Sequence, residues 1–132
     1  DLIQIPMNII DNRWDDWLNE LHSHKVEIHV RSVFLQGLLL MPQQDRPNKF
    51  DKWADLWNKW EDCLKEHSLT PLEACLRYVL SKPEIAKVIV GVDSKEQLQQ
   101  IIEAANGAFP KFSLDIKTND VQLLNPSNWS AL

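Results

Sequence analysis

The sequence is poor in several features that would identify particular classes of protein. It has two cysteines among 132 residues, Cys63 and Cys75, and both lie in sequence of helical character. Two reduced thiols in a cytosolic protein are favoured over a disulfide, and no Cys/His spacing matches a zinc site, so no metal ligand is assigned. No apolar run is long enough to cross a bilayer, and no signal peptide is visible. These absences favour a cytoplasmic protein that does not enter a membrane.

The sequence also lacks a long basic run. It has 14 Lys and Arg against 19 Asp and Glu, a formal net charge of −5. This balance argues against binding to nucleic acid through its phosphates. With 44% hydrophobic and 25% charged residues, the composition is that of an ordinary globular protein. We therefore expect one domain over residues 1–132. Because the first residue is Asp1 and the chain enters a strand at once, we also expect a trimmed chain or one piece of a longer polypeptide.

Short apolar runs alternate with segments of helical periodicity. Strands are expected at residues 2–5, 26–30 and 85–92, and helices at residues 13–23, 49–67, 70–82 and 94–105. The order is β-α-β-α-α-β-α followed by a C-terminal tail, residues 108–132, which is expected to wrap along the surface. Such alternation predicts right-handed βαβ units in an α/β fold with a parallel sheet. The third strand is almost continuously apolar, which is typical of a strand covered on both faces.

One helix carries an aromatic stripe, and one strand is followed by an unusual loop. Trp53, Trp57 and Trp60 recur at helical spacing and are expected in the core; with Phe50 they could instead form an interface. Residues 31–39 follow the second strand and form a loop with one glycine. Loops at the carboxyl ends of parallel strands often hold ligands, because backbone N–H groups are free there.

Four segments, taken in order, resemble the aldo-keto reductase family. They are residues 4–13, 31–39, 70–80 and 88–98. The resemblance implies the last three strands of an eight-stranded TIM-type (β/α) barrel, hence three parallel strands with covering helices. The family reduces aldehydes and ketones with NADPH or NADH. Its catalytic Tyr, Lys, Asp and His lie on earlier strands, so no residue here is assigned a catalytic role. Tyr78, the only tyrosine, is expected to be a packed helix residue.

The resemblance implies that the chain carries part of the cofactor site. Gln4 would bind the nicotinamide carboxamide, since both groups contain a donor and an acceptor. The remaining residues would line the pyrophosphate (Ser32, Phe34, Gln36 and Gly37) or hold the adenosine end (Gly91, Val92, Asp93, Ser94 and, at the helix start, Gln97). Glycine permits close backbone approach, and a helix N-terminus offers free N–H groups to phosphate.

Three positions depart from the family pattern and bear on the choice of cofactor. Arg31 stands where the family usually has an aromatic residue that stacks on nicotinamide; a guanidinium can also stack. Asp93 stands where NADPH users place Arg, Lys or Ser, and a carboxylate there repels the 2′-phosphate. Ile101 stands where an Asn often lies near the adenine. These departures favour NADH over NADPH, or no cofactor in this chain.

Two functions remain open. In the first, the chain is the C-terminal, cofactor-binding portion of an aldo-keto reductase that acts on a small carbonyl substrate, and its partner is the N-terminal part of the barrel. The chain alone would then be inactive. In the second, it is a non-catalytic module that retains the barrel fragment for assembly. Its open sheet edges and Trp-rich helix would then pair with a second copy or with another domain.

Overall fold

The sheet predicted from the sequence is present. The computed structural model describes residues 1–111 and 115–132. Strands β1 (Leu2–Pro6), β2 (Glu27–Arg31) and β3 (Ile85–Val88) form one parallel sheet in the order β1-β2-β3. The α-helices are α1 (Asp15–Ser23), α2 (Ala54–Glu66), α3 (Pro71–Leu80), α4 (Lys95–Ala105) and α5 (Val121–Leu124), and the 3₁₀ helices are η1 (Leu38–Leu40), η2 (Gln43–Asp45), η3 (Asn48–Trp53) and η4 (Pro126–Ala131). The chain is thus an open α/β sheet, as expected for part of a barrel.

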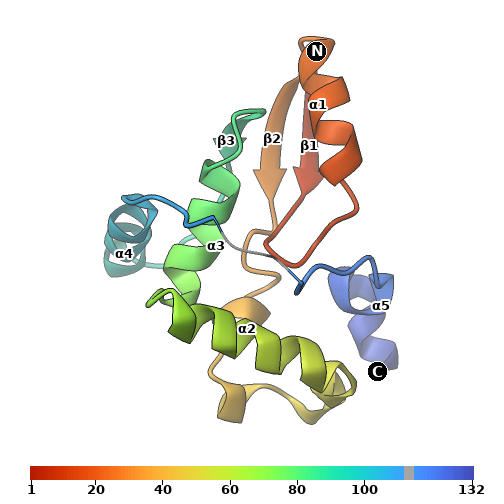
Figure 1. The fold of residues 1–132 in the computed structure, drawn as a ribbon, viewed down its shortest axis with the longest axis vertical. Helices are drawn as coiled ribbons and strands as arrows, with labels where there is room; N and C mark the ends of the chain where they lie inside the picture. The colour runs from red at the N-terminus through yellow and green to blue at the C-terminus, as the bar shows by residue number, and fades with distance from the viewer. Residues whose placement is uncertain (112–114) are drawn as a thin grey trace.

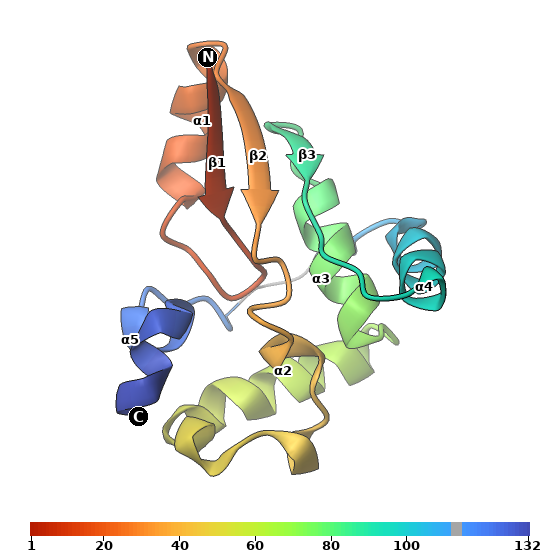
Figure 2. The same ribbon diagram turned by 180° about the vertical axis from the view of Figure 1, so that it is seen from behind.

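The two faces of the sheet differ in burial and in polarity. Along β1 and β2, Ile5, Ile28 and Val30 are buried, whereas the alternate residues Gln4 and Arg31 are exposed. Helices α1 and α3 lie over the apolar face, and none of the helices in the described part of the chain lies in front of the opposite face (Figures 1 and 2). Since side chains alternate between the faces of a strand, this arrangement places the polar set on the side that would line a barrel.

Helices α3 and α4 begin where local capping signals predict. Thr70 accepts a hydrogen bond from the backbone N–H of Glu73 at 3.2 Å, and Pro71 occupies the first helical position of α3. Ser94 caps α4 in the same way, with Gln97 as the donor. These side chains satisfy N–H groups that have no partner within the helix, which is why both helix starts could be located from sequence.

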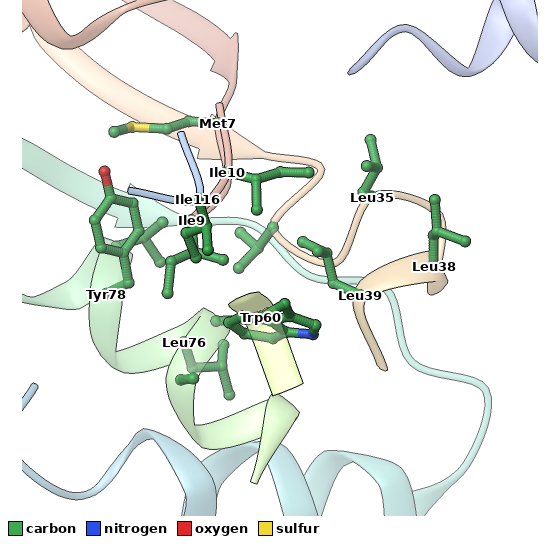
Figure 3. Close-up of a cluster of buried hydrophobic side chains, with 14 of the residues drawn as sticks. Met7, Ile9, Ile10, Leu35, Leu38, Leu39, Trp60, Leu76, Tyr78 and Ile116 are labelled. Atoms are coloured by element: carbon green, nitrogen blue, oxygen red, sulfur yellow. The ribbon is translucent and has the colours of Figure 1, made fainter. Parts of the chain in front are cut away.

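A second part of the core lies beyond the carboxyl ends of the strands. Residues that follow β1, the loop after β2, and helices α2 and α3 meet there (Figure 3). The largest of these buried side chains are Met7, Ile9, Ile10, Leu35, Leu38, Leu39, Trp60 and Ile116. Trp57, Trp60 and Phe50 are buried and Trp53 is half-buried, so the aromatic stripe belongs to the core and is not available as an interface.

Two expectations need correction. The third strand ends at Val88 rather than at residue 92, and its residues are half-buried or exposed, because β3 is an edge strand with one neighbour in the sheet. The tail is not a surface wrap: Ile116, Leu123 and Leu124 are buried. Positions 112–114 of the predicted tail lie outside the described residues.

The C-terminal segment is joined to the loop after β1. Asp11 and Thr118 form an isolated parallel bridge, supported by the bond from the Thr118 N–H to the Ile10 carbonyl at 2.7 Å. The Lys117 ammonium also donates to the Asp11 carbonyl at 3.2 Å. This joint holds the end of the chain against its beginning.

Candidate functional site

The loop after β2 contains an unusual run of left-handed backbone. Ser32, Leu35, Gln36 and Gly37 have φ values of 61°, 49°, 55° and 82°. A non-glycine residue pays roughly 1–2 kcal/mol for this conformation. Gly37 is the only glycine in the loop and has open space where a side chain would begin, so its conformation and not crowding explains why glycine suits the position.

A buried amide holds this loop against the first strand. Asn8 is buried at the end of the β1 segment, and its Nδ2 lies 3.5 Å from the carbonyl oxygen of Ser32. Its Oδ1 accepts a hydrogen bond from the backbone N–H of Ile10 at 3.2 Å. Asn8 was not selected from the sequence as a site residue. The available signal is a polar side chain two residues after a strand, within an otherwise apolar segment.

A pocket lies between this loop and the start of α4. Its volume is about 240 Å³, and it is lined by Phe34, Leu40, Leu72, Gly91, Gln97, Gln100 and Ile101. Phe34 comes from the first predicted cofactor segment, and Gly91 and Gln97 come from the second. The fold therefore brings together two segments that are more than fifty residues apart in the chain.

The second predicted cofactor segment, which includes Asp93, Ser94 and Gln97, is held in place by hydrogen bonds between its own residues. The Gln97 side-chain oxygen accepts from the backbone N–H of Asp93 at 2.8 Å, and Ser94 Oγ accepts from the N–H of Gln97 at 3.1 Å. Residues 91–94 are exposed. Because the oxygen of Gln97 is occupied, its NH₂ group is the part that can donate to a ligand. Gly91 has open space beside it and no left-handed conformation.

Gln4 and Arg31 lie elsewhere, on the open face of the sheet. Gln4 pairs with His29, and Arg31 pairs with Pro6 at the carboxyl ends of their strands. Both side chains are exposed, and the Arg31 guanidinium donates to Ser32 Oγ at 3.1 Å. Neither residue lines the 240 Å³ pocket.

Three of the eleven predicted cofactor residues thus line one pocket: Phe34, Gly91 and Gln97. The other eight do not line it: Gln4, Arg31, Ser32, Gln36, Gly37, Val92, Asp93 and Ser94. Sequence reasoning missed Leu40, Leu72 and Gln100. Gln100 could have been found because it lies three residues after Gln97 on the same helix face, whereas Leu72 has no local signal.

The only tyrosine, Tyr78, does not line this pocket. Tyr78 is buried in α3, and its hydroxyl is hydrogen-bonded to the Lys117 ammonium. Burial raises the pKa of Tyr78. Burial also lowers the pKa of Lys117, although the Asp15 carboxylate at 3.2 Å opposes this shift. Tyr78 is therefore a packed helix residue with a polar anchor, as expected.

The other hollows and ionisable groups described here are less suited to binding a ligand or a metal ion. A larger hollow of about 520 Å³ lies by the C-terminus, but Lys49 and Lys52 at its wall already donate to the Trp129 carbonyl and to Gln122. Both cysteines are free. Within the described residues, no group of three or more His, Cys, Asp or Glu is arranged to hold a metal ion. None of the described helices is long and apolar enough to cross a membrane.

Comparison with known proteins gives a family match over most of the chain. The model of the Aldo/keto reductase family matches residues 1–117. The chain is 28% identical over 115 residues to "Uncharacterized oxidoreductase YqkF" of Bacillus subtilis (strain 168), covering 79% of this chain and 37% of that protein.

Solved structures show the same fold. Aldo-keto reductase AKR11C1 from Bacillus halodurans matches with a TM-score of 0.66 in its apo form (18% identity, 96% of this chain, 46% of that chain). Its holo form matches with a TM-score of 0.60 (21% identity, 83% of this chain, 38% of that chain). The chain therefore spans less than half the length of these relatives. Over most of its own length, the chain belongs to the aldo/keto reductase family.

Proposed function

We propose that residues 1–132 form one domain, the C-terminal and cofactor-binding portion of an NAD(P)H-dependent aldo-keto reductase that reduces aldehydes or ketones by hydride transfer. One observation carries this proposal: the pocket that joins Phe34 of the loop after β2 to Gly91 and Gln97 at the start of α4. It lies at the carboxyl ends of parallel strands, where open α/β sheets bind ligands.

The pocket suits one end of a dinucleotide. Its volume of about 240 Å³ is below the roughly 300–1,000 Å³ of a complete small-molecule site. Phe34, Leu72 and Ile101 offer flat apolar walls, and the amides of Gln97 and Gln100 offer hydrogen bonds. An adenine ring has apolar faces and a polar edge, which this combination fits.

The remaining predicted residues have defined tasks in this proposal. Gln4, on the open face, binds the carboxamide of the nicotinamide, and Ser32, Gln36 and Gly37 present backbone and side-chain donors to the pyrophosphate. The cofactor, when bound, supplies the hydride. This chain binds and orients it, whereas the acid that protonates the carbonyl oxygen comes from the rest of the barrel.

Calorimetric titration of the chain with NADH tests the proposal. Saturable binding is expected, with NADPH about tenfold weaker, because the Asp93 carboxylate repels the two charges of the 2′-phosphate. Asp93→Ser should narrow this difference, and Asp62→Ser, at an exposed position on α2, should not. Absence of saturable NADH binding would contradict the proposed function.

A turnover assay tests whether the chain binds the cofactor without catalysing the reaction by itself. Carbonyl-dependent oxidation of NADH by the isolated chain should not exceed background, because no catalytic residue is assigned to it. Turnover above background that survives repurification would show that the chain carries its own acid.

A second candidate, a non-catalytic assembly module, is favoured by a different observation. Several large apolar side chains are exposed near the two free edges of the sheet: Leu2 and Trp17 on the β1 side, and Ile89, Val92, Leu98 and Ile102 on the β3 side. Exposed apolar patches often mark interaction sites. Here the partner is a second copy or the remainder of the barrel.

Sedimentation velocity separates the two candidates. The assembly module predicts a concentration-dependent dimer that is weakened by the double substitution Leu98→Gln and Ile102→Gln. These positions are on the exposed side of α4, so the folded monomer should tolerate the change. A monomer at high concentration would count against assembly with a second copy.

A further inference from the structure

A side chain continues the pairing of β1 with β2 beyond the ends of the two strands. The strands pair in parallel as far as Pro6 and Arg31. The Met7 N–H then donates to the Arg31 carbonyl at 3.0 Å, and Nδ2 of Asn8 donates to the Ser32 carbonyl at 3.5 Å. The Asn8 amide therefore takes the place of a main-chain donor at the point where the loop after β2 begins.

The Asn8 side chain is itself fixed in direction. It is 2% exposed, so solvent has little access to its amide. Its Oδ1 accepts from the N–H of Ile10 at 3.2 Å, and its main-chain carbonyl accepts from the N–H of Asp11 at 3.1 Å. Because the oxygen and the NH₂ group belong to one planar amide, holding the oxygen also sets the direction of the donor that reaches Ser32.

The loop after β2 requires such support from outside. Ser32, Leu35 and Gln36 are left-handed, with φ values of 61°, 49° and 55°. Residues other than glycine keep this conformation only where the surrounding structure imposes it. The Ser32 carbonyl accepts from Asn8 and also from the N–H of Leu35 at 3.1 Å. One oxygen thus connects the buried amide to the hydrogen bond that closes the turn.

This turn carries one wall of the pocket described above. Phe34 lies within the turn between Ser32 and Leu35, and it lines the pocket opposite residues of α4 such as Gln97. The Phe34 carbonyl accepts from the N–H of Leu39 at 3.3 Å, and Leu35 is buried in the core. A change at the Ser32 carbonyl would therefore shift the Phe34 wall and leave the α4 side of the pocket in place.

We propose that Asn8 is a positioning residue for the dinucleotide: through the Ser32 carbonyl it places Phe34 against the adenosine end of the cofactor. Asn8 does not itself line the pocket, so it acts without touching the ligand. This inference rests on the proposed function, which assigns the pocket to that end of the cofactor. A purely structural asparagine would need only its oxygen, for the turn with Ile10, whereas the positioning role needs its NH₂ group.

Calorimetric titration of the 132-residue chain with NADH and with adenosine monophosphate tests the proposal. Asn8→Asp keeps an acceptor for the Ile10 N–H and replaces the NH₂ group by a second oxygen. Asn8→Ser is the second variant, because it is neutral, can still accept from the main chain and is too short to replace Nδ2. The matched control is Leu18→Ala, which weakens the buried side of α1 and lies outside the pocket. Phe34→Ala supplies the background for a double-mutant cycle.

Both Asn8 variants should bind the two ligands about tenfold more weakly than the unmodified chain, under conditions where urea denaturation shows every variant to be folded. Leu18→Ala should bind them with unchanged affinity. In the Phe34→Ala background, Asn8→Ser should change the affinity by less than about twofold, because the wall that Asn8 positions is gone. In nuclear magnetic resonance spectra of the cofactor-free chain, the amide signals of residues 32–37 should shift in both Asn8 variants and not in Leu18→Ala.

Three results of the titrations would overturn the proposal: unchanged affinity in both Asn8 variants, an equal loss in Leu18→Ala, or an undiminished effect of Asn8→Ser in the Phe34→Ala background. Either Asn8 variant suffices if the other does not fold. Failure of both ligands to bind the unmodified chain rejects the proposed function instead. The spectra of the cofactor-free chain then still decide whether Asn8 holds the loop, and unshifted signals of residues 32–37 would show that it does not.

Discussion

Replacing Gly107 with alanine should destabilise the chain by disturbing the end of α4. Gly107 has φ +155°, and a Cβ built there would lie 2.5 Å from Cζ of Arg77. Arg77 is not free to move without cost. Its Nε donates to the carbonyl of Ala104 at 2.9 Å and its Nη2 to that of Asn106 at 3.2 Å, so this side chain satisfies carbonyls at the C-terminus of the helix.

The magnitude has two sources. A non-glycine residue in this backbone conformation costs roughly 1–3 kcal/mol. Displacing the guanidinium loses two hydrogen bonds that are partly exposed to solvent, worth about 1 kcal/mol each. Gly107→Ala should therefore lower the free energy of unfolding by about 3–5 kcal/mol, a large part of the stability of a small domain.

Urea denaturation followed by tryptophan fluorescence and circular dichroism measures this loss, provided that both probes give one transition. The control is a double-mutant cycle with Arg77→Met, which keeps the aliphatic stem and removes the donors. In that background Gly107→Ala should cost only the backbone strain, so the two substitutions should be coupled by about 2 kcal/mol. An equal cost in both backgrounds would refute the assigned contact between Gly107 and Arg77.

Other predictions concern the core, the thiols and the glycines of the site. Trp57→Phe should cost about 1 kcal/mol more than Trp60→Phe in urea denaturation, because the Trp57 indole N–H donates to a main-chain carbonyl at 3.0 Å and that of Trp60 has no acceptor in the described part of the chain; equal costs would contradict this. Burial raises the pKa of Cys63 from 9.0 to about 11, so at pH 8 iodoacetamide should modify it about a hundredfold more slowly than in the unfolded chain. Because the pKa of Cys63 is higher in the folded chain than in the unfolded chain, the contribution of this thiol to the free energy of unfolding is present below pH 9. This contribution should be lost as the pH rises from 9 towards 11, and urea denaturation at each pH would detect the loss. Gly37→Ala should destabilise the fold by about 1–2 kcal/mol, whereas Gly91→Ala should leave stability unchanged and weaken NADH binding; an unaltered dissociation constant would argue against close approach of the cofactor at Gly91.

Local signals explain which parts of the fold could be predicted from sequence. The starts of α3 and α4 depend on capping by Thr70 and Ser94, which act on residues three positions away. The alternation of apolar runs and helical periodicity is also local, and it was sufficient for the parallel sheet. The apolar run continues to residue 92, but the pairing of β3 stops at Val88 because its partner strand β2 ends at Arg31.

Tertiary relations explain what could not be predicted. Ile116 and Leu123 are buried, yet the segment that carries them has no period in its sequence. Its position is set by contacts with the loop after β1 and with η3. Leu72 enters the pocket because α3 packs beside the loop after β2. The left-handed conformations of Ser32 and Leu35 had no signal either, because neither residue type favours them and Asn8 stabilises the loop from outside.

The joint between Asp11 and the C-terminal segment has a consequence for how the chain folds. The bond from Lys117 to the Asp11 carbonyl spans 106 residues, and closing a loop of that length costs about 4 kcal/mol of chain entropy. During synthesis, the loop after β1 can therefore make these contacts only after residues 117 and 118 have been made. The sheet can form early, but the core beyond its carboxyl ends is completed last. The nascent protein should consequently expose apolar surface late in translation and depend on chaperones at that stage.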